Sequence, residues 1–216
     1  MDIFETIKQR HSVRQYVSKK IEQEKRKLLL DEIKKINEEN NLHLQIFFDE
    51  PKCFNSIMAR MGKFSGVHNY IALVGKASSG LEEKCGYYGE KLVLLAQSLG
   101  LNTCWVAMTH GKSLATINSE ERQVCIIALG YGKNQGVAHK SKSIGEVTEC
   151  KGTVPDWFEM GMEAVLLAPT AMNQQKFKFT LHDENISAVS TGGICSDVNL
   201  GIVKYHFEAV TGRNVN

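Results

Sequence analysis

Residues 169–175 read Pro-Thr-Ala-Met-Asn-Gln-Gln, and this polar segment separates an amphipathic run from an alternating one. The run before it, residues 156–168, predicts a helix, and Phe177-Lys-Phe-Thr-Leu181 after it alternates apolar and polar residues as a strand does. A helix that delivers a Thr and an Asn to the start of a strand suits recognition of a flat ligand with polar edges. The segment also lies where the second part of the chain begins to resemble the first.

The order of expected elements supports that likeness. In the first part, apolar periodicity and Gly stops predict a helix, a strand, a buried strand and a core helix, over residues 28–36, 42–48, 69–75 and 87–99. In the second part the same order is expected over residues 156–168, 177–181, 186–189 and 197–210. The chain therefore contains a weak internal repeat, which starts again at Lys151 and rests on element order rather than on residue identity.

Other segments complete the predicted organisation. A short helix is expected near Ile3–Ile7, strands over 103–108 and 124–130, and an exposed basic loop over 132–143, whereas residues 50–66 show no assignable pattern. Pro155 followed by Asp156 and Glu159 predicts a start similar to a capping box for the helix there, with Asp in place of Ser or Thr.

Composition limits the class of protein. The chain has 216 residues, of which 43% are hydrophobic and 23% charged, as is ordinary for a globular protein, and the net charge of +2 gives no general attraction to nucleic acid. No apolar stretch approaches the roughly 20 residues of a membrane span. The N-terminus lacks the basic and apolar regions of a secretory signal, so a cytoplasmic location is expected, with neither membrane nor nucleic acid as a partner.

Most familiar catalytic and metal motifs are absent from the sequence. The six cysteines form no Cys-x-x-Cys pair, which removes most zinc and dithiol sites, and Cys104 and Cys125 are expected to be small buried residues. Gly130-Tyr-Gly132 with Gly136 lacks the spacing and the following helix of a Rossmann loop. His206 is expected to be a packed or half-exposed residue rather than to bind a ligand.

Two basic segments are candidates for a phosphate site. Arg10-His-Ser-Val-Arg14 places two guanidinium groups and a hydroxyl just past a helix, and Arg matches phosphate geometry with paired hydrogen bonds. The alternative is a solvated helix end. Lys140 and Lys142 would point the same way from an extended segment and approach one phosphate, although two solvated lysines fit the sequence equally well.

These segments together resemble the FMN-dependent nitroreductase family. The N-terminal one is similar to the family's Arg-x-Ser-x-Arg phosphate motif, and the polar one to its Ala-Pro-Ser-x-x-Asn-x-Gln flavin motif, with Thr170 in place of Ser. The central helix running into Gly-Leu-x-x-Cys-Trp, and the late strand with its basic loop, also match. The matching segments are residues 6–16, 88–105, 127–147 and 168–175.

The resemblance implies an α+β nitroreductase-like fold, a mixed sheet flanked by helices, with internal pseudo-duplication. In usual members the flavin motif follows the second helix, near residues 35–40 of this chain, and reaches the flavin of a partner subunit. Here it lies at 169–173, as in the subgroup in which a shortened second half is fused on and imitates the partner. Residues 1–150 would then be a nitroreductase-like half and 151–216 a shortened half, in a monomer preferentially or else a homodimer.

The resemblance also implies a cofactor, bound FMN, and roles for individual residues. Arg10, Ser12, Lys140 and Lys142 would hold its phosphate, with His11 alongside, and Arg14 would lie near the N1–C2 edge of the ring. Thr170 and Asn173 would bind ring or ribityl oxygens, with Pro169 setting the turn. Trp105 would form a pocket wall or core, and backbone groups of Ala107 and Met108 would face N5 of the flavin.

The function expected on this basis is hydride transfer from NADH or NADPH through FMN to a small-molecule acceptor such as a nitroaromatic or a quinone. No protein side chain need act as a catalytic acid or base, because the cofactor carries the chemistry. Two other classes stay open: a flavin-binding protein without turnover, for storage or sensing, and a purely structural domain. The sequence leaves the physiological acceptor and the choice of nicotinamide donor open.

Overall fold

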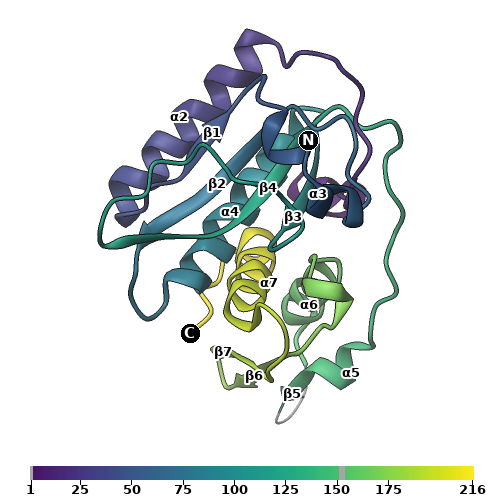
Figure 1. Cartoon of the computed structure of the whole chain (residues 1–216). Coiled ribbons are helices and arrows are strands. Elements are labelled where there is room, and N and C mark those ends of the chain that lie inside the picture. The colour runs from purple at the N-terminus through teal and green to yellow at the C-terminus, as the bar shows by residue number, and fades with distance from the viewer. Residues whose placement is uncertain (1, 151–153) are drawn as a thin grey trace. The chain divides into compact units, whose positions relative to one another are not determined.

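The computed structural model describes residues 2–150 and 154–216. Its α-helices are α1 Ile3–Gln9, α2 Gln23–Asn40, α3 Ile57–Met61, α4 Leu81–Ser98, α5 Ile144–Val147, α6 Asp156–Leu166 and α7 Ser196–Thr211, and its 3-10 helices are η1 Lys52–Phe54 and η2 Ala171–Asn173. Its strands are β1 Gln45–Phe47, β2 Asn69–Lys76, β3 Asn102–Val106, β4 Glu121–Gly130, β5 Thr148–Cys150, β6 Phe177–His182 and β7 Asn185–Ser190. Figure 1 shows these elements along the chain.

The chain divides into two compact units, which are described one at a time. The four-stranded unit comprises Arg10–Leu81 and Leu92–Val137, and the three-stranded unit comprises Met1–Gln9, Glu82–Lys91 and Ala138–Asn216. The predicted start of a second half at Lys151 lies outside the described residues. The predicted halves, residues 1–150 with the phosphate site and 151–216 with the flavin motif, are defined by the cofactor groups that they would hold. This division stays a prediction.

The four-stranded unit is built on an antiparallel sheet in the order β1-β2-β4-β3. Strand β2 is buried from Asn69 to Gly75, because an apolar run without alternation packs on both of its faces. Strand β4 pairs with β2 on one side and with β3 on the other, with Ile127 opposite both Ile71 and Trp105. Strand β3 thus forms one edge of this sheet.

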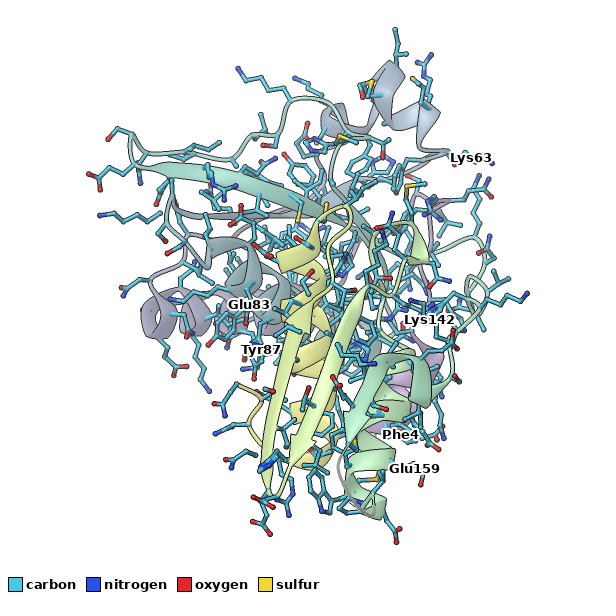
Figure 2. All side chains as sticks on the ribbon, turned by 90° about the horizontal axis from the view of Figure 1, so that it is seen from below. Phe4, Lys63, Glu83, Tyr87, Lys142 and Glu159 are labelled. Atoms are coloured by element: carbon cyan, nitrogen blue, oxygen red, sulfur yellow. The ribbon has the colours of Figure 1, made fainter. Side chains whose placement is uncertain are left out.

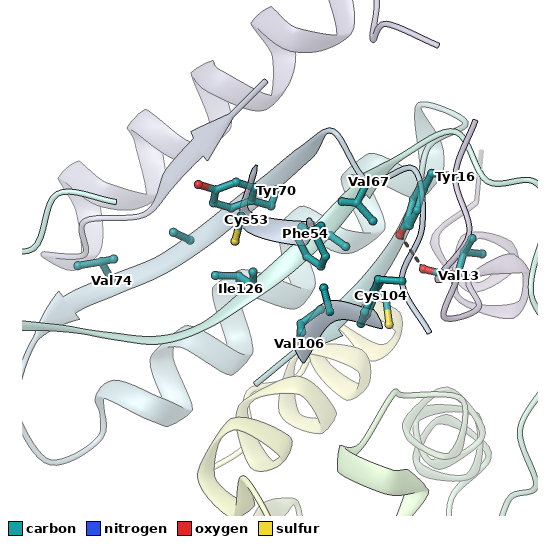
Figure 3. Close-up of a cluster of buried hydrophobic side chains, with 14 residues drawn as sticks. Val13, Tyr16, Cys53, Phe54, Val67, Tyr70, Val74, Cys104, Val106 and Ile126 are labelled. Atoms are coloured by element: carbon teal, nitrogen blue, oxygen red, sulfur yellow. Dashed lines mark hydrogen bonds between the residues drawn. The ribbon is translucent and has the colours of Figure 1, made fainter. Parts of the chain in front are cut away.

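Each face of this sheet has its own core. On one face α2 and the end of α4 contribute Leu29 and Ala96, which pack with Leu101 and Leu129. The opposite face carries Tyr70, Ala72, Val74, Cys104, Val106, Ile126 and Ala128, and η1 and α3 cover it with Cys53, Phe54 and Ala59 (Figure 3). Tyr16 joins this second cluster, and its hydroxyl donates to the carbonyl of Val13 (2.7 Å).

The three-stranded unit combines a mixed sheet with packed helices. Strand β6 pairs in parallel with β5 and antiparallel with β7, while α6 packs against α7. Aromatic rings fill its core: the ring centroid of Phe207 lies 5.5 Å from that of Phe158 and 5.4 Å from that of Phe179. A helix pair and a sheet thus bury one common apolar layer.

The N-terminal half of α4 crosses α7 very closely within this unit. A Cβ at Gly86 would lie 2.1 Å from the carbonyl oxygen of Val198, and a Cβ at Gly201 would lie 2.0 Å from that of Glu83. Beside the crossing, Tyr87 donates to a carboxylate oxygen of Glu208 (2.6 Å), and Lys204 pairs with Glu83 (2.7 Å); Glu83 and Tyr87 are labelled in Figure 2. Glycine on both helices permits this approach.

The repeated element order predicted from the sequence is confirmed. The order α2-β1-β2-α4 in the first part recurs as α6-β6-β7-α7 in the second, with the paired strands antiparallel in both cases. The first part has η1 and α3 in addition, between β1 and β2, and the second has η2 between α6 and β6. Cys104 and Cys125 are buried as predicted, and none of the six cysteines forms a disulfide. In the described part of the chain, no helix has the length and apolar character needed to cross a bilayer.

Some local predictions were wrong. Residues 50–66 contain η1 and α3 rather than irregular chain only, and β1 is shorter than the predicted strand over 42–48. The capping box predicted at the start of α6 is absent, because Pro155 is the N-cap and Asp156 is already helical. A capping box occurs instead at α5, where Ser143 and Glu146 bind each other's backbone N–H groups.

Candidate functional site

The Arg10–Arg14 segment and the residues after it are fixed by backbone hydrogen bonds within the four-stranded unit. Beside the edge strand β3, Val13 N–H donates to the carbonyl of Thr103 (3.0 Å), and Ser12 forms an isolated parallel bridge with Thr103. On the other side, Ser65 N–H donates to the carbonyl of Arg14 (3.0 Å), and Tyr16 N–H donates to that of Ser65 (2.9 Å). The segment thus pairs with backbone groups that an edge strand otherwise leaves without a hydrogen-bond partner.

The cations of this segment differ in exposure. Arg10 is only 3% exposed, so it does not fit the alternative of a solvated helix end, whereas Arg14 is exposed. Burial raises the pKa of the Cys104 thiol, and the cations of Arg14 and Arg10, together with a hydrogen bond from Ser12, oppose that shift. These three predicted site residues therefore all oppose the rise in the pKa of one buried thiol on β3.

The glycines after β4 allow their loop to approach this segment. A Cβ at Gly136, which has φ +73°, would lie 2.7 Å from the Cβ of His11 and 3.1 Å from the carbonyl oxygen of Ser12. A Cβ at Gly132 would lie 2.9 Å from a methyl group of Val13. The Gly-x-Gly-x-x-x-Gly spacing thus has a packing reason in this fold.

A cavity of about 420 Å³ lies in the four-stranded unit and includes part of the predicted site. This volume is within the range of roughly 300–1,000 Å³ typical of small-molecule sites. The cavity is lined by Arg14, Met61, Gly62, Lys63, Phe64, Trp105, Val106, Ala107 and Thr109. We call it the redox cavity. Its lining residues include two cations and no carboxylate, so it suits an electron-rich or anionic ligand.

The structure brings some predicted residues together in the redox cavity and not others. Arg14, Trp105 and Ala107 line it, and Trp105 is a pocket wall, one of its two predicted roles. Met108 does not line it and is 73% exposed.

Sequence reasoning missed Lys63 and Phe64, which also line the redox cavity. They follow α3, in the stretch that showed no assignable pattern. A signal for α3 does exist: the Ser56 hydroxyl accepts a hydrogen bond from Ala59 N–H (3.1 Å) at its start, and Gly62 follows its last residue. A Ser cap and a Gly stop with only five residues between them mark too short a helix for apolar periodicity to reveal.

In the three-stranded unit Gln175 joins four of the other predicted site residues, Lys140, Lys142, Thr170 and Asn173. Its side-chain amide accepts from Lys142 N–H (2.9 Å) and donates to the carbonyl of Lys140 (2.8 Å) and to Oδ1 of Asn173 (2.9 Å). Its own N–H donates to the hydroxyl of Thr170 (3.1 Å). Gln175, which is 3% exposed, therefore holds the basic loop and the polar segment together, and the sequence prediction did not include it.

The polar segment itself adopts an unusual backbone. Met172, Asn173 and Gln175 have φ of 52°, 54° and 47°, a conformation that is costly for residues with a Cβ. The side chain of Asn199, on α7, accepts from Ala171 N–H (2.9 Å) and so supports the turn. Strain kept in place by such contacts is characteristic of functional segments, and here it follows Pro169.

The lysines of the basic loop have different surroundings. Lys140 is exposed, whereas the ammonium of Lys142 donates to the carbonyl of Gln175 (2.9 Å), so Lys142 is not simply a solvated lysine. Asn173 donates to the carbonyl of Lys140 (2.8 Å). Asn173 and Lys142 thus each use a side-chain hydrogen bond to hold the basic loop and the polar segment together.

On the expectation from the sequence resemblance that this chain binds FMN, replacing Gln175 by Leu should weaken FMN binding about tenfold, because buried hydrogen bonds that hold the loop and the turn are lost and their partners stay unsatisfied. The dissociation constant of FMN, measured by flavin fluorescence, tests this. Gln23→Leu, at the exposed first residue of α2, is the control and should change the constant by less than twofold. A Gln175→Leu protein with wild-type affinity would show that this network has no part in binding.

The sequence matches a known family along most of its length. The family model described as "Putative TM nitroreductase" matches residues 2–211. No curated protein sequence matches the chain. Because the family model covers almost the entire sequence, it matches both compact units rather than one of them.

Solved structures show the same fold. A "putative nitroreductase" from Thermotoga maritima is similar with a TM-score of 0.70 and 23% identity, covering 97% of this chain and 83% of its own. A "putative nitroreductase in complex with FMN" from Desulfovibrio desulfuricans gives a TM-score of 0.56 and 18% identity, covering 71% of this chain and 98% of its own. At these identities the likeness concerns the fold alone, and it confirms the predicted fold class. With the family match over residues 2–211, the chain belongs to the nitroreductase family.

Proposed function

We propose that this protein is an FMN-dependent oxidoreductase that transfers a hydride from NADH or NADPH, through bound flavin, to a nitroaromatic, a quinone or a similar acceptor. Family membership supports the oxidoreductase class. The observation that carries the proposal is the redox cavity, in which Arg14 and Trp105 come together with Ala107 on the edge strand and its continuation.

The residues present fit FMN chemically. Arg10 and Ser12 offer charge-assisted and neutral donors to a phosphate, and Gly136 keeps the loop after β4 close to them without a side chain in between. The redox cavity offers an aromatic wall, Trp105, and an apolar one, Val106. We also propose that the same cofactor is held by Lys140, Lys142, Pro169, Thr170 and Asn173, with His11 near the phosphate.

When bound, FMN supplies two-electron chemistry: it accepts a hydride from a reduced nicotinamide and gives two electrons to a second substrate. The guanidinium of Arg14 is suited to stabilise negative charge on the N1–C2 edge of the ring, because it is a permanent cation that lines the cavity. Lys63, on the same cavity, adds to that field. No carboxylate or imidazole is among its lining residues, so acid–base catalysis by those groups is not part of the proposal.

Anaerobic reduction tests the proposal. The protein loaded with FMN is mixed with NADH or with NADPH, and the visible flavin absorption is followed. Bleaching with at least one donor, and recovery of the colour when a quinone is added, are expected. If neither donor bleaches bound flavin, the reductase proposal fails and flavin binding without turnover replaces it.

A further inference from the structure

A second cavity, of about 400 Å³, lies in the four-stranded unit and is not used by the proposed flavin site. Its apolar walls include Phe54 and Phe64, whose ring centroids are 5.1 Å apart at an interplanar angle of 62°. Polar groups come from Asn55, Arg60, Ser65 and His68. A cavity with aromatic walls and a few polar groups is the usual form of a site for a heteroaromatic ligand.

The ionisable side chains that line this second cavity are all basic. Arg60 and His68 line it, and its lining residues include no carboxylate. Arg60 is exposed, and within residues 2–150 and 154–216 its guanidinium makes no ion pair or side-chain hydrogen bond. A free, planar set of N–H donors beside an aromatic cavity is suited to a phosphate group.

The second cavity adjoins the redox cavity, because Phe64 lines both. The wall between them is fixed: Ser65 N–H donates to the carbonyl of Arg14 (3.0 Å), and Phe64 N–H donates to that of Ala59 (3.0 Å). A dinucleotide with its nicotinamide in the redox cavity carries its adenosine on a flexible pyrophosphate. A neighbouring aromatic cavity is therefore placed to receive that adenosine.

We propose that the second cavity binds the adenosine 2′-phosphate of NADPH, with Arg60 as the phosphate ligand, so that the protein prefers NADPH to NADH. This inference rests on the proposed function. In Rossmann-fold proteins, those that select NADH bind the ribose diol with a carboxylate, whereas an Arg accommodates the 2′-phosphate, and the same chemistry applies to a cavity in a different fold. The lining of this cavity offers the Arg and lacks the carboxylate.

Direct binding tests the site without any redox reaction. Adenosine 2′,5′-bisphosphate, AMP and inorganic phosphate are titrated calorimetrically into wild-type protein and Arg60→Ala. The bisphosphate should bind wild type at least tenfold more tightly than AMP, and Arg60→Ala should weaken the bisphosphate about tenfold while changing AMP less than twofold. Lys27→Ala removes one exposed cation from α2 and should leave all three unchanged.

Other results would overturn the proposal. Equal affinity for AMP and the bisphosphate, or an unchanged bisphosphate affinity in Arg60→Ala, would show that the 2′-phosphate is not recognised there. Inorganic phosphate that binds wild type as tightly as the bisphosphate does would indicate a simple anion site. That result would also reject the proposal.

The redox readout is separate. Wild type should reduce its flavin with a higher kcat/KM for NADPH than for NADH, and Arg60→Ala should lower the NADPH value about tenfold with little change for NADH. If neither donor reduces the flavin, the proposed function fails, and the calorimetric result still decides whether the second cavity recognises a 2′-phosphate.

Discussion

Replacing His206 by Ala is expected to lower the free energy of unfolding by about 3–5 kcal/mol, because it removes one partner of a fully buried pair. The His206 and Glu90 side chains are 0% exposed, and Nε2 lies 2.9 Å from Oε1 of Glu90. Nδ1 lies 2.9 Å from the carbonyl oxygen of Ala164, which can only accept, so Nδ1 carries a hydrogen. Urea denaturation followed by circular dichroism measures the change.

The surroundings of this pair explain the size of the effect. Glu90 on α4, Ala164 on α6 and His206 on α7 meet at one point of the three-stranded unit. Without the imidazole, the buried Glu90 side chain would lose its hydrogen bond to His206 and would lie beside an empty cavity. The lost hydrogen bond and the cavity each lower the free energy of unfolding. Glu90→Gln keeps the shape and can donate to a neutral Nε2, so we expect it to cost less than half as much as His206→Ala.

A matched control is His182→Ala, because that side chain is 64% exposed and its ion-pair partner Asp183 is also exposed. It should change the free energy of unfolding by less than about 0.5 kcal/mol. A loss below about 1 kcal/mol for His206→Ala would show that the pair contributes little and that the helices are held by apolar packing.

Arg10→Ala is expected to raise the dissociation constant of FMN by about tenfold to hundredfold, because a charge-assisted hydrogen bond to the phosphate is lost. Riboflavin, which lacks the phosphate, gives the discriminating comparison. Its affinity should be nearly equal in wild type and variant. Both constants can be measured by quenching of flavin fluorescence at low salt, where the ionic contribution is largest.

This design separates a phosphate ligand from a structural residue. Arg10 is 3% exposed, so its removal can also disturb the segment beside β3, and such a disturbance would weaken FMN and riboflavin alike. Lys34→Ala, which removes an exposed lysine on α2, should change neither constant. Equal weakening of both flavins by Arg10→Ala would reject the phosphate assignment.

Much of the fold was predictable because its signals are local. The continuous apolar run of β2 and the repeat of helix, strand, strand and helix follow from periodicity over a few residues. The short helix α3 was missed because five residues give less than two turns of pattern. Packing of His206 was one of the two placements predicted for it, but its partner Glu90 lies 116 positions away and leaves no sequence signal.

The candidate site was likewise predictable only in part. Arg14, Trp105 and Ala107 were identified through motifs, and they line one cavity. Lys63 and Phe64 belong to no motif and reach that cavity only through the turn after α3. Gln175 lies in a motif, yet its hydrogen bonds to the basic loop span 33 and 35 positions and depend on how the chain folds back.

The most direct test of the central claim is a titration of FMN into flavin-free protein, with the bound fraction read from the visible spectrum. The proposal predicts saturation at one FMN per chain, and a bound flavin that loses its colour when a reduced nicotinamide is added without oxygen. Protein that stays colourless at every FMN concentration would contradict it, since no flavin site would then exist in this chain.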